Sequence, residues 1–161
     1  MKTINTLIIL WLISAFQPAM ATVVTSETSD EQIQKDILMY VNQYRVLHGK
    51  KPFQMNALIN KEATIHSRDM ATHRIPFGHK YFSTRIRHLY TQIKGCNGGA
   101  ENVAYNYKDT KELVRLWLKS PGHKRNIDGN YNLTGIGVAR DSNGKLYYTQ
   151  MFLRTDTNIK Y

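Results

Sequence analysis

The sequence predicts an α+β domain in which helices cover a small antiparallel sheet. Through the first two thirds of the chain, apolar residues recur at the spacing of three and four that is typical of amphipathic helices. After residue 100, three segments carry strand patterning, and helices and strands are largely segregated. The 161 residues, 42% hydrophobic and 21% charged, are enough for one ordinary domain and exclude a disordered chain.

Residues 1–21 have the pattern of a secretory signal peptide. Lys2 is the only charge, an apolar run of 10 residues follows at 7–16, and Ala19-Met20-Ala21 offers a small-x-small cleavage site. The alternative is a membrane anchor, but the run is about half of what a bilayer crossing needs. We therefore expect cleavage near Ala21 and a secreted or periplasmic protein with no transmembrane segment. Residues 22–30 would form a flexible lead-in, 31–155 a single domain and 156–161 a tail.

Two amphipathic helices are predicted first. Ser29 and Gln32 fit a capping box, and Gly49 ends the helix that follows. Its apolar face comprises Ile33, Ile37, Val41, Tyr44 and His48. Asn56 caps the second helix, which we expect to continue until residues 76–78. Its stripe comprises Ile59, Ala63, His66, Met70 and His73.

A third helix is expected over about 79–93, followed by a loop and the first strand. The inward residues of this helix would be Phe82, Ile86, Leu89 and Ile93. Three glycines within 95–99 predict a loop, because each costs about 1 kcal/mol inside a helix. Apolar and polar residues then alternate over 101–107, which predicts a strand with Glu101 and Val103 on one face.

The last third of the chain is predicted to hold two helices and a hairpin. Asp109 with Glu112 caps a fourth helix. Ser120 followed by a proline is a preferred helix start, which places His123 in the first turn of a short helix. Two apolar strands at 133–139 and 145–153 are joined by the turn residues 141–144.

His79, Glu101 and His123 are the residues best placed to carry chemistry. Each lies at an element boundary near a glycine, and such boundaries line clefts. Two imidazoles and a carboxylate could hold zinc with an open position for water, with Glu101 as a base. They could equally form a hydrogen-bonded cluster without metal.

The other candidate metal ligands and nucleophiles are weaker. His66 and His73 lie two turns apart, roughly 10 Å, which is too far for one ion, so His66 is expected to be a core histidine. Neither serine is a good candidate nucleophile, because Ser67 lies in the middle of a helix and Ser120 is explained as a helix cap. The lone Cys96 excludes an internal disulfide framework and is expected to be buried and inert.

The chain is basic, with a formal net charge of +10. Such a charge could attract nucleic acid, anionic lipid or an acidic polymer. The basic residues are scattered, however, and no nucleic-acid-binding motif is present. We therefore expect no specific nucleic-acid partner and a solvated basic surface.

Several blocks together resemble a bacterial CAP domain, the SCP-like extracellular group that includes cysteine-rich secretory proteins, antigen 5 and pathogenesis-related-1 proteins. Each block alone is short, and it is their order and spacing over about 33–153 that carry the resemblance. The blocks are residues 41–45 with 48–49, 66–71, 77–79, 100–104, 117–123, 126–127, 135–138 and 148–152.

The resemblance implies an α–β–α sandwich with a central cavity lined by two histidines and two glutamates, which can bind a divalent cation. The first histidine and the first glutamate map to His79 and Glu101. The second glutamate falls at Ser120 and the second histidine at Tyr147, so two of the four are replaced, and His123 is a substitute ligand. The predicted cavity residues are His79, Glu101, His123, Ser120, Tyr147, Asn102, Gln150 and His66.

Three functions follow as expectations. The first is a secreted, monomeric binding module that takes a lipid, a surface ligand or a host protein without turnover. The second is a hydrolase that uses zinc or another divalent cation on His79 and His123, with Glu101 as the base. The third is a basic protein that docks electrostatically on anionic lipid or polymer.

Overall fold

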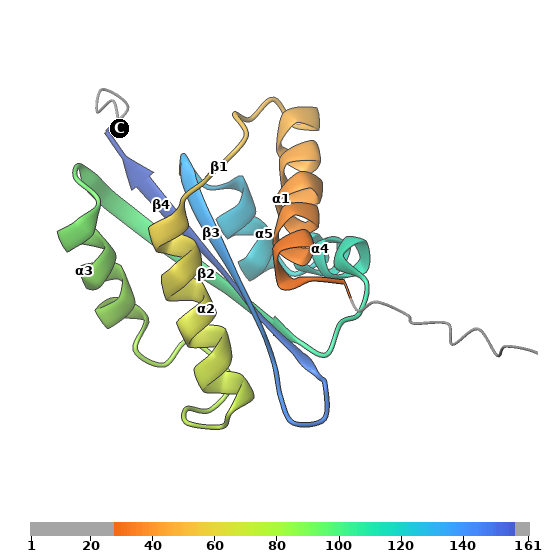
Figure 1. The fold of residues 1–161 in the computed structure, drawn as a ribbon. Helices are drawn as coiled ribbons and strands as arrows, with labels where there is room; N and C mark the ends of the chain where they lie inside the picture. The colour runs from red at the N-terminus through yellow and green to blue at the C-terminus, as the bar shows by residue number, and fades with distance from the viewer. Residues whose placement is uncertain (1–27, 157–161) are drawn as a thin grey trace, which may run out of the picture.

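The computed structural model describes residues 28–156, which fold into three layers (Figure 1). The helices are α1 (Asp30–Leu47), α2 (Ala57–Ala71), α3 (Phe82–Gln92), α4 (Thr110–Lys119) and α5 (Pro121–Asp128). The strands are β1 (Gln54–Met55), β2 (Cys96–Tyr105), β3 (Leu133–Arg140) and β4 (Leu146–Thr155). Helices α2 and α3 lie on one side of the sheet and α1, α4 and α5 on the other. The predicted α+β class and the α–β–α sandwich are confirmed.

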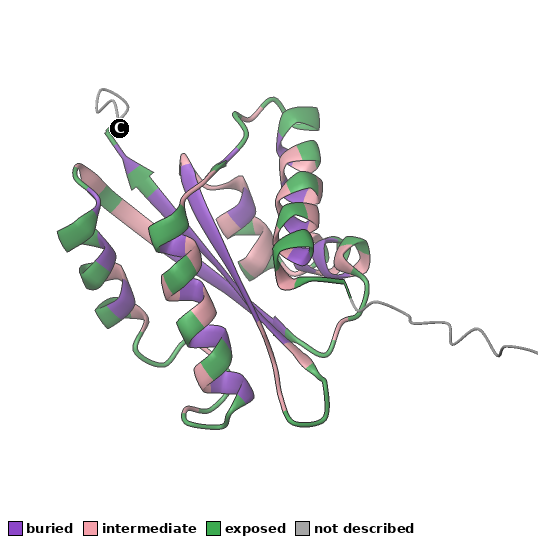
Figure 2. Ribbon diagram, in the orientation of Figure 1, coloured by how far each residue is buried: buried purple, intermediate pink, exposed green. Residues whose placement is uncertain are grey.

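The sheet has the strand order β1-β3-β4-β2, which makes β2 an edge strand. Strand β4 pairs antiparallel with both β2 and β3, and β1 pairs parallel with β3. Both faces of the sheet are covered, so the central strands are buried almost throughout (Figure 2).

The pleat sends alternate side chains into two separate cores. Even-numbered residues of β4 join the core under α1, α4 and α5, which includes Ile37, Val41, Leu113, Trp117, Ile127, Tyr148 and Phe152. Odd-numbered residues join the core under α2 and α3, which includes Ile59, Ala63, Leu89, Ile93, Met151 and Leu153. Consecutive residues of one strand therefore point into different layers of the protein.

Two glycines of β3 let α2 lie directly on the sheet. A Cβ atom on Gly135 would stand 2.3 Å from the backbone carbon of Ile59, and one on Gly137 would stand 2.1 Å from that of Ala63. These distances are far below van der Waals contact. The same approach places Ser67 Oγ 3.1 Å from the carbonyl oxygen of Gly137 and 2.9 Å from Thr149 Oγ1. Ser67 is thus a buried packing residue.

Three of the predicted helix caps are present. The side chains of Ser29, Asn56 and Asp109 each accept hydrogen bonds from backbone N–H groups in the first turn of their helices. Ser120 stands before Pro121 as expected, but its hydroxyl makes no capping hydrogen bond. That hydroxyl stays available to the surroundings of α5.

Two helix boundaries differ from the prediction. Helix α2 ends at Ala71, and His73 lies beyond it, exposed, with a positive φ of 55° that no α-helix tolerates. Helix α3 begins at Phe82 instead of His79, because Tyr81 takes the left-handed conformation. Residues 72–81 form a connecting loop that carries Phe77 and His79.

The strand predictions need two corrections. Residues 96–99, predicted as a loop, belong to β2, with a register shift between Cys96 and Gly98. The glycines correctly excluded a helix here, but the edge of a sheet accommodates them through this irregularity. The two-residue strand β1 was not predicted, because two residues show no periodicity.

Cys96 is a half-buried free thiol, and burial raises its pKa. Among the described residues, no helix has the length and hydropathy needed to cross a bilayer. The predicted signal peptide and most of the lead-in lie outside the described residues.

Candidate functional site

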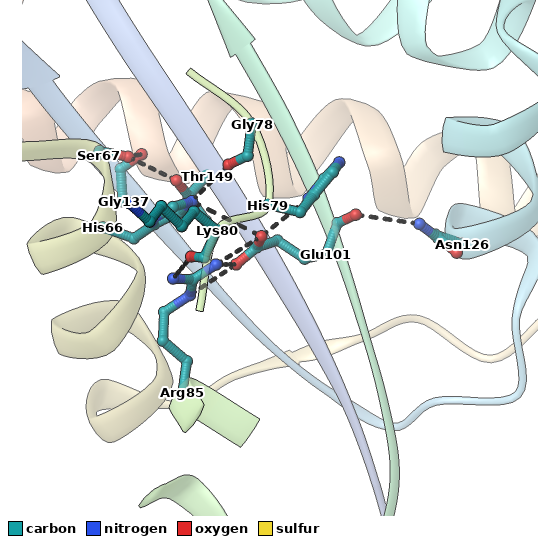
Figure 3. A network of polar contacts seen from close by, with 10 residues as sticks. All are labelled: His66, Ser67, Gly78, His79, Lys80, Arg85, Glu101, Asn126, Gly137 and Thr149. Carbon is teal, nitrogen blue, oxygen red and sulfur yellow. Dashed lines mark hydrogen bonds and ion pairs between the residues drawn. The ribbon is translucent and has the colours of Figure 1, made fainter. Parts of the chain in front are cut away.

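A buried ion pair between Glu101 and Arg85 is the centre of the site (Figure 3). Strand β2 directs the Glu101 carboxylate toward α2 and α3, where its side chain is 1% exposed. Arg85 of α3 donates from Nε to Oε2 at 2.9 Å and from Nη2 to Oε1 at 2.8 Å. Its Nη1 donates to the carbonyl oxygen of Lys80 at 2.7 Å. The carboxylate is thereby neutralised by a planar, bidentate partner.

His79 approaches the same carboxylate from the loop between α2 and α3. Its Nδ1 lies 2.9 Å from Glu101 Oε1. Because an ionised carboxylate only accepts, Nδ1 carries the proton and Nε2 is left with a lone pair in the neutral ring. The His79 side chain is 51% exposed, and its far nitrogen points away from the carboxylate (Figure 3). Glu101 therefore orients an accessible imidazole.

His66 of α2 completes the cluster and is a core histidine, as predicted. Its Nε2 lies 2.9 Å from the carbonyl oxygen of Gly78 and 3.6 Å from Glu101 Oε1. Burial lowers its pKa against the opposing effect of the Glu101 charge. Its Nδ1 has no hydrogen-bond partner within the described residues. His66 in its neutral form thus ties the 72–81 loop to α2.

The fold should lose stability as the pH falls below about 6.5, the ordinary pKa of the His66 imidazole. The folded pKa of His66 lies below that value, so the unfolded chain binds a proton there that the folded chain does not. We expect the free energy of unfolding in urea to be lower at pH 5 than at pH 7.5. The His66→Gln variant should show a smaller difference, and an equal difference would contradict this role.

A second polar group lies across the strand, toward α5. Asn102 Nδ2 donates to the carbonyl oxygen of His123 at 3.2 Å, and Asn126 Nδ2 lies 2.8 Å from Asn102 Oδ1. Asn126 Nδ2 also lies 3.2 Å from the carbonyl oxygen of Glu101. The His123 ring packs 6.2 Å from Trp117, centroid to centroid. Its pKa is lowered, first by burial and then by the charge of His79.

The eight residues predicted for one cavity are therefore divided among several places. His66, His79 and Glu101 meet on the α2–α3 face, whereas Asn102 and His123 belong to the α5 face. The remaining three are Ser120 beside His123, Tyr147 stacked 5.7 Å from Tyr105, and Gln150 in the core with Nε2 3.2 Å from Thr134 Oγ1.

Two hollows lie along the outer edge of β2, and we call them together the edge groove. The larger, about 360 Å³, is lined by Phe77, Val103, Ala104, Tyr105, Tyr107, Leu113, Leu116, Trp117, Ser120 and His123. The smaller, about 300 Å³, is lined by His79, Phe82, Gly99, Ala100, Glu101, Asn126 and Tyr131. Each hollow touches residues from both faces of the sheet, so each must lie at the open edge of the strand.

Comparisons with known proteins identify the family. The model of the cysteine-rich secretory protein family, CAP, matches residues 38–152. The chain belongs to the CAP family. It is 34% identical over 125 residues to the uncharacterized membrane protein YlbC of Bacillus subtilis (strain 168), covering 75% of this chain. The chain spans 34% of the length of that relative.

Solved structures agree on the fold. An outer surface protein of Borrelia burgdorferi superposes with a TM-score of 0.70 at 15% identity, covering 80% of this chain and 97% of that one. A cysteine-rich secretory protein of Staphylococcus aureus superposes with a TM-score of 0.67 at 23% identity, covering 79% and 40%. At these identities the likeness concerns the CAP fold alone.

The residues of this CAP domain do not fit the zinc site that the resemblance implied. Both oxygens of Glu101 already accept hydrogen bonds from Arg85, and one also accepts from His79. A catalytic zinc needs three protein ligands. Between residues 28 and 156, no three His, Cys, Asp or Glu side chains are grouped so that they could hold a metal ion. The guanidinium of Arg85 supplies the positive charge at this carboxylate.

Arg85 is the site residue that the sequence reasoning missed. It is three residues after Phe82 and four before Leu89, which places it on the inward face of α3. A charged residue on an apolar stripe is rarely buried unless it is paired. The position of Arg85 on this apolar face could have indicated that it pairs with a buried acidic side chain.

Proposed function

We propose that this CAP domain belongs to an extracellular binding protein that holds its ligand in the edge groove without breaking a bond. Family membership and the signal-peptide pattern of residues 1–21 support the location. The single observation that carries the binding role is the larger hollow, because its walls are mostly aromatic and aliphatic side chains with a few polar atoms. Such composition is typical of ligand sites.

The neighbouring charge cluster supports binding over turnover. Glu101 is engaged by Arg85 and His79, so its carboxylate is a poor candidate for a general base. Ser67, the helix serine beside this cluster, is buried against Gly137 and Thr149. The cluster serves instead to hold the 72–81 loop, and with it Phe77, at the rim of the groove.

Phe77→Ala tests the groove as the ligand site. Phe77 is 47% exposed and lies 4.9 Å from the Tyr105 ring, so its removal opens one wall without disturbing the core. We expect the affinity for an uncharged fluorescent apolar probe, N-phenyl-1-naphthylamine, to fall about tenfold through the lost apolar contact. Leu47→Ala is the matched control, since Leu47 is an exposed apolar residue of α1 outside the groove. Equal probe binding by both variants would rule out the groove.

Zinc-assisted hydrolysis, the second expected function, can be tested directly. His79 presents an oriented ring beside the smaller hollow, and its Nε2 has no hydrogen-bond partner among residues 28–156. One nitrogen is a single ligand, so we expect calorimetric titration of the secreted chain with zinc to show no site of micromolar affinity. Micromolar binding in the parent that is lost in both His79→Ala and His123→Ala would overturn this expectation and establish the metal site.

Electrostatic docking on anionic surfaces remains the third candidate, on the ground of the net charge of +10. Binding of this kind weakens steeply with salt, whereas binding in the edge groove should not. Repeating the probe titration at about 0.05 M and about 0.5 M salt, with phosphatidylglycerol vesicles in parallel, separates the two.

A further inference from the structure

The outer edge of β2 presents backbone groups that no strand uses. β2 is the last strand of the sheet and pairs only with β4. The N–H of Asn106 donates to the carbonyl oxygen of Leu146 at 2.7 Å, so even-numbered residues direct their backbone groups toward β4. Odd-numbered residues therefore direct theirs outward. The carbonyl oxygen of Glu101 agrees with this direction, because it accepts from Asn126 of α5.

Val103 lies opposite Thr149 of β4, lines the larger hollow and is 5% exposed. Neither its outward N–H nor its outward C=O has a hydrogen-bond partner among residues 28–156. Val103 is one of the residues that line the hollow of about 360 Å³. An N–H and a C=O at strand spacing match the backbone of one further extended chain.

The walls of the hollow carry polar atoms that a purely apolar ligand would leave unsatisfied. The Ser120 hydroxyl does not cap α5. A fatty acyl chain would cover the Ser120 hydroxyl and the Val103 backbone without supplying hydrogen bonds to them. A polypeptide supplies both donors and acceptors together with an apolar side chain.

The charge of the surface around the groove further restricts the class of ligand. The chain carries a net charge of +10, and exposed Lys108 and Lys119 adjoin the groove residues Tyr107 and Ser120. Acidic side chains that flank the apolar one would meet a favourable potential here.

We propose that the edge groove binds an extended acidic segment of another protein, which pairs with Val103 as a fifth strand. Its apolar side chain enters the hollow between Phe77 and Trp117. This inference rests on the proposed function and names the ligand class of the same groove.

The test is a titration of the isotope-labelled secreted chain with a synthetic hexapeptide of alternating phenylalanine and glutamate, followed by NMR. We expect the amide signals of Val103 and Tyr105 to shift. The same peptide N-methylated at alternate residues should bind at least about tenfold more weakly, because it lacks the pairing N–H groups. Val103→Pro removes the outward N–H, which an edge strand tolerates, and should also weaken binding about tenfold relative to Val103→Ala.

Three results would overturn the proposal. The first is equal affinity for the methylated and unmethylated peptides, or equal binding by Val103→Pro and Val103→Ala. The second is concentration-dependent dimerisation that shifts the Val103 amide without peptide, which would make a second copy the occupant. The third is failure of the peptide while the apolar probe still binds in a Phe77-dependent way, which leaves the proposed function standing. If neither peptide nor probe binds, both proposals fail.

Discussion

Replacing Arg85 with methionine will lower the free energy of unfolding by about 3–5 kcal/mol. The substitution keeps most of the side-chain volume but leaves the Glu101 carboxylate, 1% exposed, without its bidentate partner. His66 remains nearby, but burial lowers its pKa, so it does not replace the lost positive charge at neutral pH. Urea unfolding followed by circular dichroism measures the loss.

Arg87→Met is the matched control for this prediction. Arg87 lies two residues further along α3 and is exposed, so its replacement should change stability by less than about 0.5 kcal/mol. The double variant Arg85→Met/Glu101→Leu should recover much of the loss, because it removes both charges. If Arg85→Met proves as stable as Arg87→Met, the buried ion pair does not exist as described.

Gly137→Ala will destabilise the fold by about 3 kcal/mol or more. In an ordinary strand the same change would stabilise, because alanine restricts the unfolded chain more than glycine does. Here the new Cβ would stand 2.1 Å from the backbone carbon of Ala63 and 2.2 Å from its oxygen, so α2 must move off the sheet. The movement would also shift His66 and the loop that it holds. Thermal unfolding monitors the effect.

Gly122→Ala separates this clash from a general intolerance of alanine. Gly122 lies in the first turn of α5, and a Cβ there would meet nothing within 4 Å. It should leave stability unchanged or raise it slightly. A Gly137→Ala variant with the stability of Gly122→Ala would show that α2 does not lie on β3 at this distance.

The layered architecture explains why the groove lies where it does. Strand β2 is the outermost strand, and the 72–81 loop on one side and α5 on the other leave its edge between them. Asn126 reaches over this edge to the Glu101 carbonyl, in the way that the N–H of a neighbouring strand would. The groove is thus a consequence of ending the sheet at a strand whose two faces are covered.

Local patterns in the sequence were enough for most elements and for the family. The caps at Ser29, Asn56 and Asp109 depend on side chains that bond within their own first turn, so they can be recognised without tertiary information. The end of α2 could not be recognised in this way, because the 72–81 loop is held by the long-range contact of His66 with Gly78. The start of β2 was missed because glycines pair in a sheet edge when a neighbouring strand is present.

The sequence by itself determined the fold class and the family, and it singled out His79 and Glu101 as candidate site residues. Only the tertiary structure decided that His123 lies across β2 from that cluster and that Arg85 occupies the carboxylate. The physical reason is the pleat of one strand. Glu101 and Asn102 are adjacent in the chain yet face opposite layers, and which helix covers each face depends on long-range packing that no local pattern records.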